Sequence, residues 1–279
     1  MHRPADVRAL VIGAVSRDRD LARPGGPDRP GGVVVHAGST WARLGARTGV
    51  LTRLDLADAP WLLASLAAVG VDVMALPSAA TTVCANDYQG PTDRHELLAT
   101  SDTVRALDVP GEWRDAHVVQ LGPLHPHDID PDLPRVLRGR VALDLQGLLR
   151  APPGRPAPER AALDPWLRAA DVVQVSADDA ARLVDGSDPV SLCRTHHVSE
   201  LLMTLGARGV DVVTPAGCRH VAGEAVRGGD PTGAGDVFLA AYLFAREAGA
   251  APLEAAEGAC RLAAAHVADA GRPKAAPAP

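Results

Sequence analysis

Residues 229–238 read GDPTGAGDVF and lead into an almost wholly apolar stretch. Two glycines bracket an alanine where a loop would enter a helix, so we expect the N–H groups of Gly233, Ala234 and Gly235 to point outward at an anion. Asp236 then places a carboxylate in the first helical turn, within reach of an attacking hydroxyl. Either acid of this stretch, taken alone, is explained as a cap. Together with the glycines they indicate an anion hole beside a base.

The rest of the chain alternates between short apolar runs and segments of helical length. Strands are predicted at 9–15, 49–54, 71–76, 117–121, 141–145, 171–175 and 201–205, and helices at 36–46, 60–69, 234–248 and 253–268. This alternation predicts a parallel sheet covered by helices. Two β-prone segments, 81–88 and 95–101, are joined by the turn-rich residues 89–93 and predict a hairpin instead.

Composition describes an ordinary globular chain of 279 residues, with 47% hydrophobic and 22% charged residues. The net charge of −6 is mixed in sign along the sequence, so we expect no nucleic-acid partner. No apolar run is long enough to cross a bilayer and the N-terminus lacks a secretory pattern, so we expect no membrane partner and a cytoplasmic location. The four cysteines form no CxxC pair and predict neither a zinc site nor disulfides.

Lys274 is the only lysine, and it lies in the Ala- and Pro-rich segment 272–279, which we expect to fray. A Walker A loop, a protein-kinase strand lysine and a pyridoxal Schiff base each need a lysine at a structured site. The sequence therefore excludes those three classes.

The pattern Asp-x-Thr-Gly-Ala-Gly-Asp at 230–236 resembles the hallmark motif of the ribokinase-like carbohydrate kinases, also called the phosphofructokinase B family. The resemblance implies a ribokinase-like three-layer α/β/α fold over 1–279, with a mostly parallel central sheet and a small β lid built from 29–35 and 81–101. It also implies ATP and Mg²⁺ as cofactors and Asp236 as the catalytic base. Gly233, Ala234 and Gly235 would stabilise the transferring phosphoryl group.

Two N-terminal segments extend the resemblance to the substrate side. GAVSRD at 13–18 resembles the family segment whose terminal acid binds substrate hydroxyls, which assigns that role to Asp18. GGVVVHAG at 31–38 is similar to the family's Gly-Gly-x-x-x-Asn-x-Ala, in which the glycines let the substrate approach the backbone. Gly31 and Gly32 inherit that role, and His36 stands where the family has Asn.

Two further segments match the donor side. TLGARG at 204–209 is similar to the family's Thr-Leu-Gly-x-x-Gly, which lines the ATP phosphates, and Thr232 belongs to the hallmark motif itself. The resemblance gives ATP contacts to Thr204, Gly206, Gly209 and Thr232.

VVQVSADD at 172–179 occupies the place of the family's Asn-x-x-Glu, whose side chains organise water around Mg²⁺. Ser176 and Asp179 are the counterparts, and both are shorter than usual. The resemblance assigns Ser176 to the cofactor site and Asp179 to Mg²⁺ through water. A serine N-cap followed by first-turn acids fits these residues equally well.

Segments 81–88 and 143–150 look similar to segments of the myo-inositol kinases and their relatives in this family. This similarity makes Asn86, Gln146 and Arg150 candidates for the substrate pocket, with an ordinary polar cluster at strand ends as the alternative. The run HPHD at 125–128 has no third metal ligand at a recognisable spacing and is interpreted as a polar loop.

The sequence thus predicts an ATP-dependent kinase for a hydroxyl of a small polyol, either a cyclitol such as myo-inositol or a sugar. A nucleoside kinase of the same family and a non-catalytic nucleotide- or polyol-binding protein are the alternatives. A Rossmann dehydrogenase ranks last, because no G-x-G-x-x-G follows the first strand. The lid hairpin would leave unpaired edges, so we expect it to pair with its copy in a homodimer.

Overall fold

The computed structural model describes residues 8–21, 25–87, 94–151, 159–184 and 188–270. Within these residues nine strands form one sheet in the order β13-β12-β11-β10-β9-β8-β1-β4-β5. They are β1 (Ala9–Gly13), β4 (Thr48–Leu54), β5 (Asp72–Pro77), β8 (Val118–Gly122), β9 (Arg140–Asp144), β10 (Val172–Ser176), β11 (Glu200–Thr204), β12 (Gly209–Thr214) and β13 (Gly217–Ala222). The strands pair in parallel from β5 to β11, and β12 and β13 add an antiparallel edge. The predicted mostly parallel sheet is confirmed, while the β12–β13 hairpin was not predicted.

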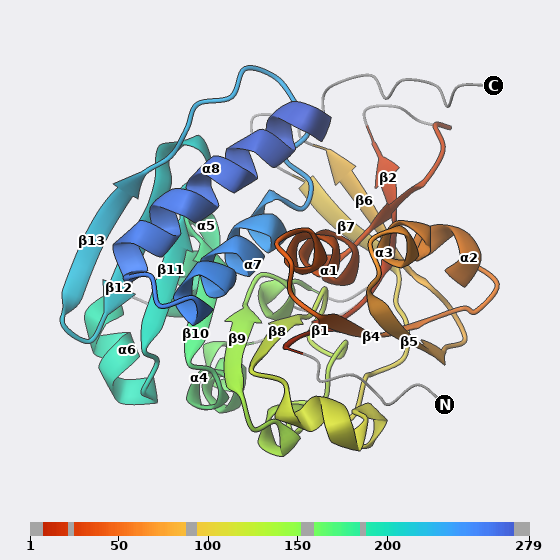
Figure 1. The fold of residues 1–279 in the computed structure, drawn as a ribbon, viewed down its shortest axis with the longest axis horizontal. Coiled ribbons are helices and arrows are strands. Elements are labelled where there is room, and N and C mark those ends of the chain that lie inside the picture. The colour runs from red at the N-terminus through yellow and green to blue at the C-terminus, as the bar shows by residue number, and fades with distance from the viewer. Residues whose placement is uncertain (1–7, 22–24, 88–93, 152–158, 185–187, 271–279) are drawn as a thin grey trace.

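Helices cover both faces of this sheet. They are α1 (Val33–Arg43), α2 (Ala59–Leu62), α3 (Ala64–Ala68), α4 (Asp164–Ala169), α5 (Ala177–Val184), α6 (Pro189–His196), α7 (Ala234–Glu247) and α8 (Pro252–Ala270). Single 3₁₀ turns lie at η1 (Ala106–Asp108), η2 (Gly111–Asp115), η3 (Leu133–Val136), η4 (Gly147–Leu149), η5 (Arg160–Leu163) and η6 (Gly206–Arg208). Helices α1, α7 and α8 lie in front of the sheet in Figure 1. Among the described residues, no helix combines the length and apolar composition needed to cross a bilayer.

The central strand β1 shows how the layers are held together. Its side chains alternate, so that Ala9 and Val11 face the core beneath α1 and α7, and Leu10 and Ile12 face the core on the opposite side. All four are buried, which explains the continuous apolar run in the sequence. Full burial of a Leu or Ile side chain contributes about 2 kcal/mol, so both faces of the sheet stabilise the fold.

A second sheet of four strands forms the lid, in the order β3-β2-β6-β7: β3 (Arg29–Gly31), β2 (Ser16–Asp20), β6 (Thr82–Asp87) and β7 (Arg94–Ala99). β6 and β7 pair antiparallel as predicted, and their turn at 89–93 and the tail 272–279 lie outside the described residues. Two predictions differ from the structure. The polar residues of β2 were not predicted to form a strand, and the lid segment 29–35 is a strand only to Gly31. Residues 33–35 are apolar and buried, and they form the first turn of α1 against the core.

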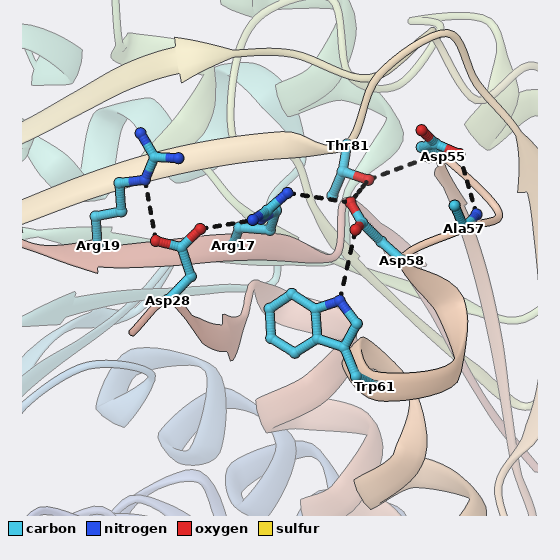
Figure 2. A network of polar contacts seen from close by, with 8 residues as sticks. All are labelled: Arg17, Arg19, Asp28, Asp55, Ala57, Asp58, Trp61 and Thr81. Carbon is cyan, nitrogen blue, oxygen red and sulfur yellow. Dashed lines mark hydrogen bonds and ion pairs between the residues drawn. The ribbon is translucent and has the colours of Figure 1, made fainter. Parts of the chain in front are cut away.

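A polar network on the outer face of the lid fixes the orientation of β2 (Figure 2). The Arg17 guanidinium lies 3.0 Å from Asp28 and 3.7 Å from Asp58, and 5.8 Å from the centre of the Trp61 ring. Asp58 also accepts a hydrogen bond from Trp61. Because neighbouring side chains of a strand point to opposite faces, anchoring Arg17 on this face turns Asp18 to the other face.

Candidate active site

The turn that opens α7 requires glycine at position 233. Gly233 has a φ of 77°, in the left-handed region that favours glycine. A Cβ at this position would also overlap the imidazole ring of His36. Backbone conformation and packing therefore select the same residue.

Two of the three predicted anion-hole amides stay available in this turn. The Ala234 N–H donates to Pro231 O at 3.0 Å. Within the part of the chain that the structure describes, no hydrogen bond involves the N–H of Gly233 or Gly235. These two groups lie at the positive end of a 14-residue helix, where a phosphate oxygen is favoured.

Buried glutamines support the first turn of α7 from the sheet. The Gln174 Nε2 donates to Gly235 O at 3.2 Å, and the Gln120 Nε2 donates to Asp236 O at 3.5 Å. Both side chains are buried, where an amide needs partners. Sequence reasoning missed them, although a glutamine inside each of the apolar runs VVQLG and VVQVS was a visible signal.

Asp236, the third residue of α7, lies among charged groups from three other elements. Burial raises the pKa of the Asp236 carboxyl well above its usual range, and the negative charge of Asp144 raises it further. The Arg150 guanidinium acts in the opposite direction, and Asp18 adds a smaller increase. A carboxylate whose affinity for a proton is raised in this way is suited to general-base chemistry.

Asp18, on the lid strand β2, is the second carboxylate of the group. Burial raises the pKa of Asp18 to about 6, against the opposing effects of the Ser16 hydroxyl and of Arg150. Ser16 Oγ donates to Asp18 Oδ1 at 2.6 Å. The opposite strand carries Gly31 here, and a Cβ on that residue would overlap the Asp18 carboxylate. Gly31 therefore makes room for Asp18.

Asp144, at the carboxyl end of β9, is a site residue that sequence reasoning missed. It accepts hydrogen bonds from the Gln146 N–H at 2.9 Å and from Gln174 Nε2 at 3.2 Å. Burial raises its pKa, and Arg150 lowers it. The signal was an acid ending the apolar run VALD, because ligand sites of parallel sheets lie at the carboxyl ends of the strands.

The candidate acceptor residues lie around these acids. The positive charge of Arg150 lowers the pKa of Asp18, Asp144 and Asp236. In the β2–β6 register Asp18 pairs with Cys84 and Asp20 with Asn86, which places Asn86 on the same lid face as Asp18.

Glycines shape the rest of the predicted site. Gly32 has a φ of 87° and Gly209 a φ of 105°, and a Cβ on either would overlap a neighbouring carbonyl. Gly206, with a φ of 58°, opens η6 directly after β11. The side chain of Thr204 donates to Val175 O at 3.4 Å. The TLGARG segment thus forms a tight turn at the carboxyl end of β11.

The Ser176 and Asp179 pair forms the N-cap arrangement that the sequence offered as an alternative. Asp179 N–H donates to Ser176 Oγ at 3.2 Å, and Ser176 Oγ lies 3.0 Å from Asp179 Oδ2. No cluster of three or more His, Cys, Asp or Glu side chains that could hold a metal occurs among the residues described. Mg²⁺ needs only one or two carboxylates when it keeps its waters and binds substrate phosphates, and Asp179, at the start of α5, supplies one. The residues present therefore fit Mg²⁺ held through water.

The predicted polar loop 125–128 contributes one buried acid beneath the lid. Asp128 Oδ2 accepts hydrogen bonds from Leu124 N–H at 2.9 Å and from Ala14 N–H at 3.2 Å, and this ties the loop to the end of β1. Burial raises the pKa of Asp128 to about 6.

Carboxylates at the carboxyl edge of a parallel sheet, joined through Gln174 to the N-terminal turn of a helix, are typical of an α/β protein with a ligand site at this edge. The model of the pfkB family carbohydrate kinases matches residues 40–278. The chain belongs to this family.

A fructokinase from Escherichia coli is 39% identical over 82 residues, a match that spans 28% of this chain and only 26% of that relative. Solved structures extend the similarity to the whole fold. A pyrophosphate-dependent kinase in the ribokinase family, complexed with a pyrophosphate analog and myo-inositol, superposes with a TM-score of 0.80 at 23% identity, over 93% of this chain and 94% of that chain. A nucleoside kinase from Burkholderia thailandensis in complex with inosine superposes with a TM-score of 0.76 at 19% identity, over 93% of this chain and 90% of that chain. A putative ribokinase II from E. coli in complex with ATP and Mg²⁺ superposes with a TM-score of 0.74 at 20% identity, over 95% of this chain and 96% of that chain. The predicted ribokinase-like fold is confirmed.

Asp128 provides a test of the electrostatics beneath this site. A carboxyl whose pKa is raised in the folded state favours folding at low pH, and that contribution is lost as the pH rises through about 6. Asp128→Asn keeps an acceptor oxygen for both N–H groups and removes the buried charge. We expect the free energy of unfolding in urea to rise by about 1–3 kcal/mol at pH 8 and to change little near pH 4.

Asp132→Asn is the matched control, because its side chain is 66% exposed in the same stretch of chain. It should leave the free energy of unfolding unchanged at both pH values. A loss of stability at pH 8 in Asp128→Asn would contradict the buried charge.

Proposed function

We propose that this protein is a kinase that transfers the terminal phosphoryl group of ATP to a hydroxyl of a small polyol, a cyclitol or a sugar. The observation that carries the proposal is the position of Asp236. Asp236 lies in the first turn of α7, beside the N–H groups of Gly233 and Gly235, which have no hydrogen-bond partner among the described residues, and Arg150 lowers the pKa of both Asp236 and Asp18. Membership of the pfkB family carbohydrate kinases supports the reaction class.

The chemistry follows from the roles of these residues. Asp18 accepts hydrogen bonds from neighbouring hydroxyls of the acceptor and holds one of them near Asp236. Asp236 takes the proton of that hydroxyl while its oxygen bonds to the γ-phosphorus and the bond to the leaving ADP breaks. The amides of Gly233 and Gly235 stabilise the charge on the transferred group. Asp179 would hold Mg²⁺ through water, and the ion would neutralise part of the phosphate charge.

We assign the remaining predicted residues to two sides of this centre. Gly31, Gly32, Asn86, Gln146 and Arg150 belong to the acceptor side, and Thr204, Gly206, Gly209, Thr232 and Ser176 to the donor side. His36, predicted on the acceptor side, packs against Gly233 and is assigned to the support of the anion hole. Ala234 supports the anion hole through its turn bond. A homodimer joined through the lid sheet remains part of the proposal, since β7 lies at an edge of that sheet and exposes Leu98.

The aromatic residues favour a polyol over a nucleoside, because a base needs an apolar or aromatic surface. Most described aromatic side chains are buried in the two cores: Trp41, Trp113, Trp166, Phe238 and Tyr242. Phe244 packs on Trp41, and Trp61 belongs to the outer lid network, while Tyr88 lies outside the described residues. The inosine complex of the B. thailandensis protein keeps a nucleoside as the second candidate.

A ³¹P NMR assay tests the proposal directly. The protein is incubated with Mg²⁺ and ATP, or with pyrophosphate because of the pyrophosphate-dependent neighbour, and with myo-inositol, simple sugars or nucleosides in turn. We expect a phosphate ester of a polyol from ATP. Asp236→Asn should lower kcat by about 10²–10⁴-fold, since the amide cannot accept the proton, while ATP still binds. A clear preference for nucleosides would favour the second candidate, and ATP binding without any product would indicate a non-catalytic binding protein.

The charge of Arg150 should set the acid limb of the pH profile. Asp18 and Asp236 act as carboxylates, so activity is present above their pKa values and falls as the pH drops through them. Arg150 lowers both pKa values. Arg150→Leu should therefore move the acid limb of kcat/KM to higher pH, and Arg150→Lys should hold it near its original position. An unchanged limb in the leucine variant would show that the guanidinium does not act on these acids.

A further inference from the structure

Two histidines hold the anion-hole turn from the side of α8 and α1. His266, on α8, has its Nε2 2.8 Å from the carbonyl oxygen of Thr232. His36, on α1, packs edge to face against His266, with 5.6 Å between the ring centroids. The His36 ring also occupies the space where a side chain on Gly233 would lie. The two rings therefore contact both residues of the Thr232–Gly233 peptide.

The hydrogen bond of His266 fixes the direction of that peptide. A carbonyl oxygen can only accept, so His266 Nε2 carries the proton and donates it. In a planar trans peptide the C=O and the following N–H point in opposite directions. Drawing the Thr232 oxygen toward α8 therefore turns the Gly233 N–H away from α8. This N–H has no hydrogen-bond partner among the residues described, so it can face a phosphate oxygen.

His36 acts on the same turn through packing. Its Nε2 is buried and has no partner in the described part of the chain. Burial, together with the neighbouring His266, lowers the pKa of His36 to about 4, so the ring is neutral at physiological pH. A neutral ring wedged between Gly233 and His266 keeps the two at a fixed separation.

A second contact holds the start of the turn. Asp230 Oδ1 accepts from the Thr232 N–H at 3.0 Å, and Asp230 Oδ2 accepts from Arg29 of the lid at 2.8 Å. The N–H and the C=O of Thr232 are thus both fixed, one through the lid and one through α8. The N–H belongs to the Pro231–Thr232 peptide and the C=O to the Thr232–Gly233 peptide, so each of these two neighbouring peptides is held by one hydrogen bond.

We propose that His266 is a positioning residue for phosphoryl transfer, which aims the Gly233 N–H at the transferring group by holding the Thr232 carbonyl, with His36 as the packing support. This inference rests on the proposed function. It names a group that touches neither donor nor acceptor and acts only through the backbone of the anion hole.

Two amide substitutions at position 266 provide a matched test. The side-chain nitrogen of His266→Gln can reach the place of Nε2, whereas that of His266→Asn is too short. We expect His266→Asn to lower kcat by about 10- to 100-fold with the acceptor KM within about twofold, because only the anion hole is disturbed. His266→Gln should keep kcat within about threefold of the wild type. If His266 had only a structural role, the two amide variants would not be expected to differ in this way.

Calorimetric binding of Mg²⁺-ATP without acceptor gives a readout that does not depend on turnover. The dissociation constant should rise by about fivefold in His266→Asn and stay near the wild-type value in His266→Gln. If the wild type binds ATP but phosphorylates no acceptor, the proposed function fails while this comparison still tests the role of His266. Equal kcat and ATP affinity in wild type and His266→Asn, or equal damage in the two variants, would overturn the proposal.

Discussion

Three buried carboxylates, from the lid and from the carboxyl edge of the large sheet, share one opposing positive charge, and the candidate site depends on the balance between their burial and the charge of Arg150. Asp18, Asp144 and Asp236 come from the lid, from β9 and from α7, and each has a pKa raised by burial and lowered by Arg150. Bringing like charges together away from water destabilises a fold unless hydrogen bonds and an opposite charge offset the cost. Such groups cluster at functional sites, and in the proposed function these acids accept a proton and hold hydroxyls.

The surrounding structure serves to hold these acids in place. The sheet aligns the ends of β9 and β10, and the buried Gln174 joins Asp144 to the carbonyl of Gly235. The lid closes the other side: its outer network fixes β2, and Arg29 reaches the hallmark motif at Asp230. Direct hydrogen bonds through Asp230 therefore link the lid to the turn that opens α7, and with it the proposed acceptor side to the proposed donor side.

The sequence allowed most of the large sheet, the lid hairpin and the motif around Asp236 to be predicted, because each depends on local patterns of apolar residues and glycines. The strand β2 could not be predicted, since its residues are polar and it is paired on one side with β6, more than sixty residues further along the chain. Asp144 and His266 were missed for a related reason. Their importance lies in which distant backbone or charge they meet, and neither spacing nor composition records it.

The contacts of His36 also could not be predicted from the sequence. The motif predicted a substrate contact from its position, while the structure places its ring against Gly233 and His266. A side chain that replaces a family residue keeps the position in the fold, but its size decides what it touches. Here the larger ring fills the space beneath the anion hole, and glycine at position 233 accommodates it.

The most direct test of this account is a titration of the protein with ¹³Cγ-labelled aspartate, followed by NMR, with Asp18→Asn and Asp236→Asn used to assign the two resonances. The account predicts that Asp18 titrates near pH 6 and that Asp236 titrates well above the ordinary range of aspartate. Titration of both carboxyls near pH 4, the value of an unperturbed aspartate of about 3.9, would contradict it.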